Sequence, residues 1–107
     1  MKGTFLRFYV HEQRRRNGKP LYDWLLEKAR TIGIHGGSAF RAIAGYGRHG
    51  ILHEQRFFEL SADLTVEVEF VVSEEQAEQL LDLLRRERIH LVYATLPADF
   101  GVMEGDN

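Results

Sequence analysis

The 107-residue chain contains no cysteine, only two prolines and no long hydrophobic run. Without cysteine it can form neither disulfides nor thiolate metal sites, which suits a reducing cytosol. No apolar run approaches the roughly 18 residues of a membrane-spanning helix, and the first residues, MKGTFLRFYV, lack the layout of a signal peptide. The scarcity of proline also gives no signal of a linker. We therefore expect a cytoplasmic protein.

Charge of either sign is not in large excess, since the formal net charge is -2 at pH 7. Such a balance creates no overall field that would attract nucleic acid or a membrane surface. The proportions of hydrophobic residues (44%) and charged residues (28%) are those of an ordinary globular protein. We expect a single domain over residues 1–97 and a loosely ordered C-terminal tail over residues 98–107.

Hydrophobic periodicity predicts four strands and two helices. The strands are expected at Thr4–Val10, Ser38–Ala44, Asp63–Val72 and Leu91–Leu96. The first helix should begin at Pro20 and end near Gly33. Proline suits the first turn of a helix, because an N–H at that position would have no partner within the helix anyway. The second should follow residues 73–76 (SEEQ), which have the spacing of a capping box. Residues 11–19 are polar and basic, and we expect a loop there.

The order β-α-β-β-α-β predicts a ferredoxin-like α+β sandwich. Right-handed crossovers would place both helices on one face of a four-stranded antiparallel sheet. The other face would stay uncovered, although several of its side chains are large and apolar, so we expect an oligomer. Glu67 and Glu69 on that face would need basic neighbours, for which Arg7 and Arg41 are candidates.

Residues 45–50 read GYGRHG, which has the G-x-G-x-x-G spacing of dinucleotide-binding proteins. A Rossmann site also needs a helix that begins within the motif. The residues that follow, RHGILHEQRFFEL, show neither a helical stripe nor a cap, so the Rossmann interpretation fails. Two interpretations of the glycines remain: a flexible turn, or a loop base whose N–H groups hold an anion beside Arg48.

A longer stretch resembles the P-II nitrogen-regulatory signalling proteins. In those proteins a helix ends in an I-G-[I/V]-x-G turn, a strand follows, and G-F-G-R stands at the base of the regulatory loop. The matching segments here are residues 32–36 (IGIHG), 38–44 and 45–48 (GYGR). The chain is more similar still to the P-II-like proteins of the domain of unknown function 190 family. That similarity covers about residues 3 to 96 and includes residues 6–9 (LRFY), 18–22 (GKPLY) and 53–64.

The resemblance implies a homotrimer that binds an adenine nucleotide (AMP, ADP or ATP) in clefts between subunits. The nucleotide would be a regulatory ligand rather than a catalytic cofactor. The residues that the resemblance assigns to this site are Gly37, Ser38, Gly45, Tyr46, Gly47, Arg48 and His49. Residues 48–59 would form a loop that controls an unknown protein partner, by analogy a membrane transporter or channel.

The sequence departs from P-II proteins where those place further basic phosphate contacts, after the third strand and near the C-terminus. Both segments are acidic here. Arg14, Arg15 and Lys19, beside the start of the first helix, could supply the missing contacts, because a helix N-terminus with adjacent cations favours anions. The alternative is a solvated charge run. Residues 48–59 contain no tyrosine, which argues against uridylylation in this loop.

Other functions have less support in the sequence. His49 and His53 have the spacing of a helical metal clamp, but no carboxylate pattern completes a site, so we expect no metal. Ser61 and Asp63 near His53 are more simply a turn than a nucleophile set, so we expect no enzyme. The acidic third strand would repel RNA. A structural oligomer without nucleotide, or a trimer that binds a small ligand or metal, stays open.

Overall fold

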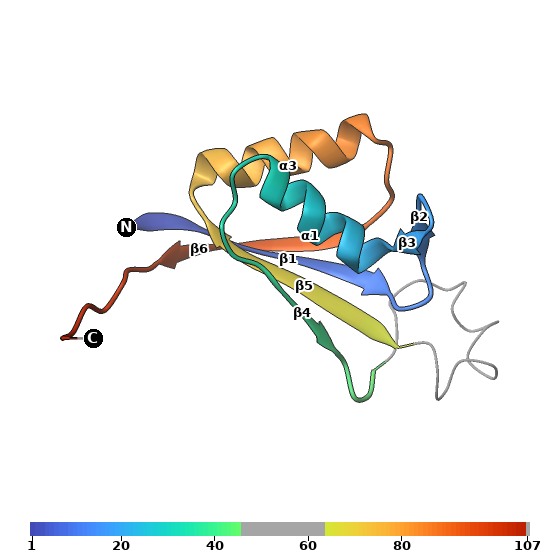
Figure 1. Cartoon of the computed structure of the whole chain (residues 1–107), viewed down its shortest axis with the longest axis horizontal. Helices are drawn as coiled ribbons and strands as arrows, with labels where there is room; N and C mark the ends of the chain where they lie inside the picture. Colours follow the sequence, from blue (N-terminus) through green and yellow to red (C-terminus); the bar gives the residue numbers. More distant parts are fainter. Residues whose placement is uncertain (46–63, 107) are drawn as a thin grey trace.

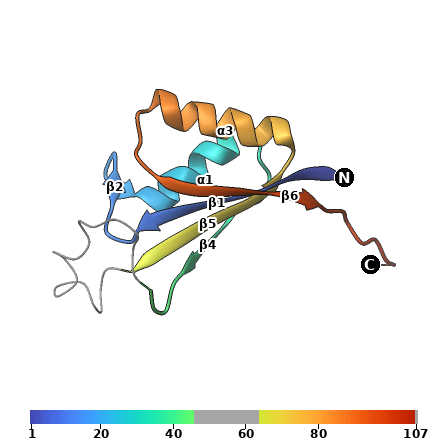
Figure 2. The same cartoon turned by 180° about the vertical axis from the view of Figure 1, so that it is seen from behind.

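The computed structural model describes residues 1–45 and 64–106. Within them a four-stranded antiparallel sheet has the order β4-β5-β1-β6. Its strands are β1 (Lys2–His11), β4 (Ser38–Arg41), β5 (Thr65–Val72) and β6 (Val92–Asp99). The helices α1 (Leu21–Thr31) and α3 (Glu74–Arg86) both lie on one side of the sheet (Figures 1 and 2). The predicted ferredoxin-like α+β sandwich is confirmed.

The core lies between the sheet and the two helices. Alternation in the central strands β1 and β5 turns every second side chain toward the helices, and full burial of each contributes about 1.5–3 kcal/mol. The buried strand residues are Leu6, Phe8, Val10, Val66, Val68, Phe70 and Val72. The helices meet them with stripes at intervals of three and four residues: Leu21, Trp24, Leu25 and Ala29 from α1, and Ala77, Leu80, Leu81 and Leu84 from α3.

The helices begin close to their predicted positions. α1 begins at Leu21, one residue later than predicted, with Pro20 as its N-cap and not in its first turn, and beyond the C-cap the chain turns at Gly33, which has a φ of +94°. At the start of α3 the capping box is complete. The Gln76 N–H donates to Ser73 Oγ at 3.0 Å, and the Ser73 N–H donates to Gln76 Oε1 at 3.2 Å. Gln76 Nε2 also donates to the Gly33 carbonyl at 3.3 Å, so one residue connects the start of α3 to the end of α1.

Residues 11–19, predicted to be a loop, include a small hairpin in which β2 (Arg15–Arg16) pairs with β3 (Lys19–Pro20). The turn between these strands consists of Asn17 at φ 52° and Gly18 at φ 82°. An Asn-Gly pair is a strong signal for a two-residue hairpin turn, because both residues tolerate positive φ. The prediction of a loop overlooked this pair and was wrong here.

The two edge strands differ in length from their predictions. β4 ends at Arg41 rather than Ala44, and beyond it one more hydrogen bond joins the Ala42 N–H to the carbonyl of Thr65, the first residue of β5, at 2.8 Å. β6 runs past Leu96 to Asp99, because β1 already begins at Lys2 and pairs with it. Among the described residues, no helix is long and apolar enough to cross a membrane.

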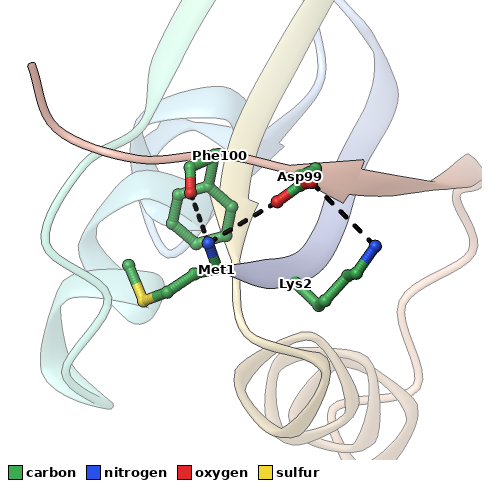
Figure 3. Close-up of polar contacts among 4 residues, drawn as sticks. All are labelled: Met1, Lys2, Asp99 and Phe100. Atoms are coloured by element: carbon green, nitrogen blue, oxygen red, sulfur yellow. Dashed lines mark hydrogen bonds and ion pairs between the residues drawn. The ribbon is translucent and has the colours of Figure 1, made fainter.

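The beginning of β1 is tied to the end of β6 (Figure 3). The Met1 amino group donates to the Phe100 carbonyl at 2.8 Å, and the Phe100 N–H donates to the Met1 carbonyl at 2.9 Å. Asp99 adds ion pairs with the Met1 amino group at 3.5 Å and with Lys2 at 3.9 Å. Residue 3 must be glycine here, because a Cβ atom would overlap the Val72 carbonyl and the Phe100 ring.

Removal of the α3 cap should weaken the fold. We expect Ser73→Ala to lower the free energy of unfolding by about 1 kcal/mol, because the Gln76 N–H loses its acceptor. Urea denaturation followed by circular dichroism measures this change. Gln79→Ala, at an exposed position of the same helix, is the control and should have little effect. Equal stability of Ser73→Ala and the native protein would contradict the expected contribution of the cap.

Candidate functional site

The residues predicted to bind nucleotide surround β4. Gly37 and Ser38 stand at its start, and Gly45 lies beyond its end at Arg41. Because a strand advances about 3.3 Å per residue, Ser38 and Arg41 are roughly 10 Å apart. The structure therefore brings Gly37 and Ser38 together and places Gly45 at the other end of the strand. The four other predicted residues lie outside the described part of the chain: Tyr46, Gly47, Arg48 and His49.

Gly37 has a packing reason to be glycine. A Cβ atom at this position would overlap the ring of Phe70 and crowd Leu26. Phe70 is buried in β5, so the absence of a side chain lets the connection between α1 and β4 cross close over it. The preceding Gly36 has open space where a Cβ atom would lie. Contact of Gly37 with a ligand stays a prediction.

The sheet face without helices carries large apolar side chains on all four strands. The strand register places Phe5, Phe40, Val71 and Leu96 on this face. Phe40, Val71 and Leu96 are 54%, 46% and 58% exposed. Ser38 lies on the same face, directly across from Glu69, and is exposed. A face that is apolar across its full width is typical of a contact surface.

Three charged residues interrupt this apolar face at its centre. Arg7 Nε lies 3.0 Å from Glu69 Oε2 and 3.6 Å from Glu67 Oε1, which confirms Arg7 as the basic neighbour of both glutamates. A hydrogen bond with the Tyr9 side chain, and then the charges of Glu67 and Glu69, raise the pKa of Arg7 above its ordinary value, against the opposing effect of desolvation. The guanidinium therefore stays charged.

The corresponding prediction for Arg41 was wrong. Arg41 lies across from Val66, a core residue, so its side chain belongs to the helix side of the sheet and not to the open face. Its Nη2 atom pairs with Glu12 Oε2 at 2.8 Å. The backbone N–H of Glu12 in turn donates to the Leu64 carbonyl at 2.9 Å. This ion pair joins the ends of β4 and β1 near the start of β5.

The basic residues of the β2–β3 hairpin are engaged by the chain itself. Arg14 donates to the His90 carbonyl, Arg15 to the Gly18 carbonyl, and Lys19 pairs with Glu27. Burial, and then the neighbouring charge of Arg16, lower the pKa of Arg14. Two guanidinium groups thus lie close together in one small hairpin. Nucleotide phosphates would have to compete with the three contacts named above.

Arg16 holds the hairpin against both helices, a contact that the sequence prediction missed. Its Nη2 atom lies 2.6 Å from Glu87 Oε1, and its guanidinium carbon lies 5.2 Å from the centre of the Trp24 ring. Lys28 Nζ lies 5.5 Å from the same ring, which gives Trp24 two cation–π contacts. Glu87 is 71 residues away in the sequence, so no local pattern could have indicated this pair.

No group of three or more potential metal ligands occurs among residues 1–45 and 64–106. His49 and His53, the pair with metal-clamp spacing, lie outside the described residues, as do Ser61 and Asp63. The chemistry that the described residues offer is therefore of another kind. They present an apolar sheet face with a central cluster of charges, and a basic hairpin fastened to the helices.

Comparison with known proteins identifies the family. The sequence profile of the DUF190 family, described as "Uncharacterized ACR", matches residues 3–92, and the chain belongs to this family. A UPF0166 protein of Aquifex aeolicus is 36% identical over 85 residues, which cover 79% of this chain and 81% of that protein. The resemblance read from the sequence motifs is thereby confirmed.

The fold is similar to that of CPII from Thiomonas intermedia, a nitrogen regulatory PII-like protein. Its structure with ADP and bicarbonate gives a TM-score of 0.63 at 19% identity, covering 95% of this chain and 91% of CPII. Its structure with ADP, AMP and bicarbonate gives a TM-score of 0.60 at 18% identity, covering 97% and 98%. At this identity the likeness establishes a P-II-like fold.

The two adjacent glycines before β4 should respond differently to the same substitution. We expect Gly37→Ala to destabilise the protein by about 1–3 kcal/mol, because the added methyl group overlaps Phe70. Gly36→Ala is the matched control, since its Cβ atom enters open space. Thermal and urea unfolding of the two variants measure the difference. A stable Gly37→Ala variant that loses only ligand binding would contradict the packing role.

Proposed function

We propose that this chain is a P-II-like regulatory protein that binds an adenine nucleotide between the subunits of a homotrimer. The observation that carries the proposal is the P-II-like fold, joined to the GYGR segment that follows β4. In the P-II proteins this segment stands at the base of the regulatory loop. CPII, which has the same fold, is described with bound ADP and AMP, which supports an adenine nucleotide as the ligand class.

The homotrimer is supported by the open sheet face. Phe40, Val71 and Leu96 would be largely exposed in a single subunit, and contact with neighbouring subunits would remove them from water. The positions of Ser38 at the start of β4 and of Gly45 beyond its end also fit a site shared between subunits. In such an assembly, the residues at the two ends of one strand would contact different clefts, or different parts of one ligand.

The mechanism would be a shift of population. In this proposal, nucleotide contacts at residues 45–49 favour one arrangement of the loop over residues 48–59, and that arrangement binds or releases a protein partner. A ligand shifts such an equilibrium only as far as it binds one arrangement more tightly than the other. The partner of such a cytoplasmic protein would be, by analogy with P-II proteins, a membrane transporter or channel. Nucleotide would act as a signal, with no catalysis involved.

A structural oligomer without nucleotide is the second candidate. The observation that favours it is the packing of Gly37 against Phe70, which explains one predicted site residue without a ligand. The contacts within the hairpin region also favour a structural oligomer. They give the donor groups of Arg14, Arg15 and Lys19 acceptors within the chain, so no phosphate is needed. Nucleotide titration separates the two candidates.

Calorimetric titration of the purified protein with AMP, ADP and ATP tests the proposal, with light scattering to give the mass. We expect a trimer that binds one nucleotide per subunit. Arg48→Ala should weaken binding by roughly 10- to 100-fold, because a hydrogen bond from a charged group contributes about 1.5–3 kcal/mol. Arg30→Ala, an exposed arginine at the end of α1, is the matched control. A trimer that binds none of the nucleotides would favour the structural oligomer.

The basic hairpin can be tested separately as a source of phosphate contacts. If Arg14 and Arg15 exchange their carbonyl partners for phosphate, the double variant Arg14→Ala, Arg15→Ala should weaken ATP and ADP binding at least tenfold and AMP binding less. The same titration, with circular dichroism to verify folding, measures this effect. Unchanged affinity for all three nucleotides would leave the hairpin arginines with a structural role only.

A further inference from the structure

The turn of the β2–β3 hairpin places an asparagine directly before a glycine. Asn17 and Gly18 are both exposed. Such a pair is prone to spontaneous deamidation, because glycine has no Cβ atom to hinder attack by its backbone nitrogen on the preceding side chain. The attack closes a five-membered succinimide ring and releases ammonia. Water then opens the ring to aspartate or iso-aspartate, so the turn contains the reactants of a covalent modification.

The closed turn holds this reaction back. Asn17 has a φ of 52° and Gly18 a φ of 82°, as a two-residue type I′ turn requires. The first residue of such a turn has a ψ of about +30°, which directs the next backbone nitrogen away from its side chain. Ring closure requires a different ψ. The hairpin must therefore open before the Gly18 nitrogen can reach the Asn17 side chain.

Contacts with other elements decide how often the hairpin opens. Each of its strands has only two residues, which is too short to stay paired without support. Arg16 Nη2 lies 2.6 Å from Glu87 Oε1 and donates to the Glu87 carbonyl at 3.2 Å. Arg14 donates to the His90 carbonyl. Both acceptor residues lie between the end of α3 and the start of β6, so this segment controls the attack on Asn17 (Figures 1 and 2).

Deamidation would change both the charge and the shape of the hairpin. Either product has a carboxylate in place of the amide, close in sequence to Arg14, Arg15, Arg16 and Lys19. In iso-aspartate the main chain also runs through the β-carbon, which adds one backbone atom to a turn built for two residues. The altered turn no longer holds Arg16 in position against Glu87. The modified hairpin would thus be less basic and more open.

We propose that Asn17–Gly18 is a site of spontaneous deamidation and that the contact of Arg16 with Glu87 controls its rate. The bond between the Gly18 nitrogen and Asn17 Cγ forms, and the bond between Cγ and the amide nitrogen breaks. The amide leaves as ammonia with the proton of the Gly18 N–H, and water supplies the oxygen of the new carboxylate. No enzyme, nucleotide or second subunit takes part. The hairpin would record covalently how long it has been open.

Incubation of the purified protein at neutral pH and physiological temperature tests the proposal. Mass spectrometry of the tryptic peptide that begins at Asn17 distinguishes the amide from its carboxylate products. We expect slow conversion of the native protein and faster conversion of protein unfolded in urea. Glu87→Ala should accelerate conversion roughly two- to fivefold, the factor expected for loss of a partly exposed ion pair. Glu87 is distant in sequence, so this variant leaves the chemistry next to Asn17 unchanged.

Two variants separate opening of the hairpin from general loss of stability. Glu78→Ala removes an exposed carboxylate from the same helix, and Ser73→Ala weakens the whole fold through the α3 cap. Both should convert at the native rate, because opening of the hairpin is local. Equal rates for Glu87→Ala and the native protein, or equal acceleration by Ser73→Ala, overturn the control by Arg16. No conversion of the native protein while the unfolded protein converts completely overturns the site itself.

Discussion

The alternation of side chains in β1 and β5 is the constraint on which the rest of the structure depends. The two strands pair antiparallel over Thr4–His11 and Thr65–Val72, and each turns one set of residues to the helices and the other to the open face. One set forms the core with α1 and α3, and the other carries the Arg7–Glu67–Glu69 cluster. A shift of one residue in this register would exchange the two sets, so the core and the composition of the open face are fixed together.

The sequence predicts those elements whose signals are local. The strong alternation from Val66 to Val72 and the capping box at Ser73 both rest on neighbouring residues, and both are confirmed. The loop predicted over residues 11–19 was wrong although its signal is also local, because the polar composition of the segment obscured the Asn17-Gly18 turn. The end of β6 was poorly predicted because it depends on where its partner β1 begins, which lies elsewhere in the chain.

The candidate site was predicted mainly through family resemblance, and the structure adds a second reason for part of it. Gly37 is required by the ring of Phe70, which no local pattern reveals. The roles of Arg7 and Arg41 differ although both were candidates for the same glutamates, because only the register decides which side of the sheet each faces. Long-range contacts such as that of Arg16 with Glu87 could not be predicted either, because they depend on the tertiary arrangement and no local sequence pattern indicates them.

The packing of Arg16 and Lys28 around Trp24 gives the molecule an intrinsic optical reporter. Trp24 is the only tryptophan of the chain and is 3% exposed. Its indole emission depends on the charges and the polarity close to the ring, and one of those charges belongs to the hairpin. Displacement of the hairpin by a bound anion would therefore change the fluorescence without any attached label. Motion at the basic hairpin can be followed in real time, on the same sample in which binding is measured.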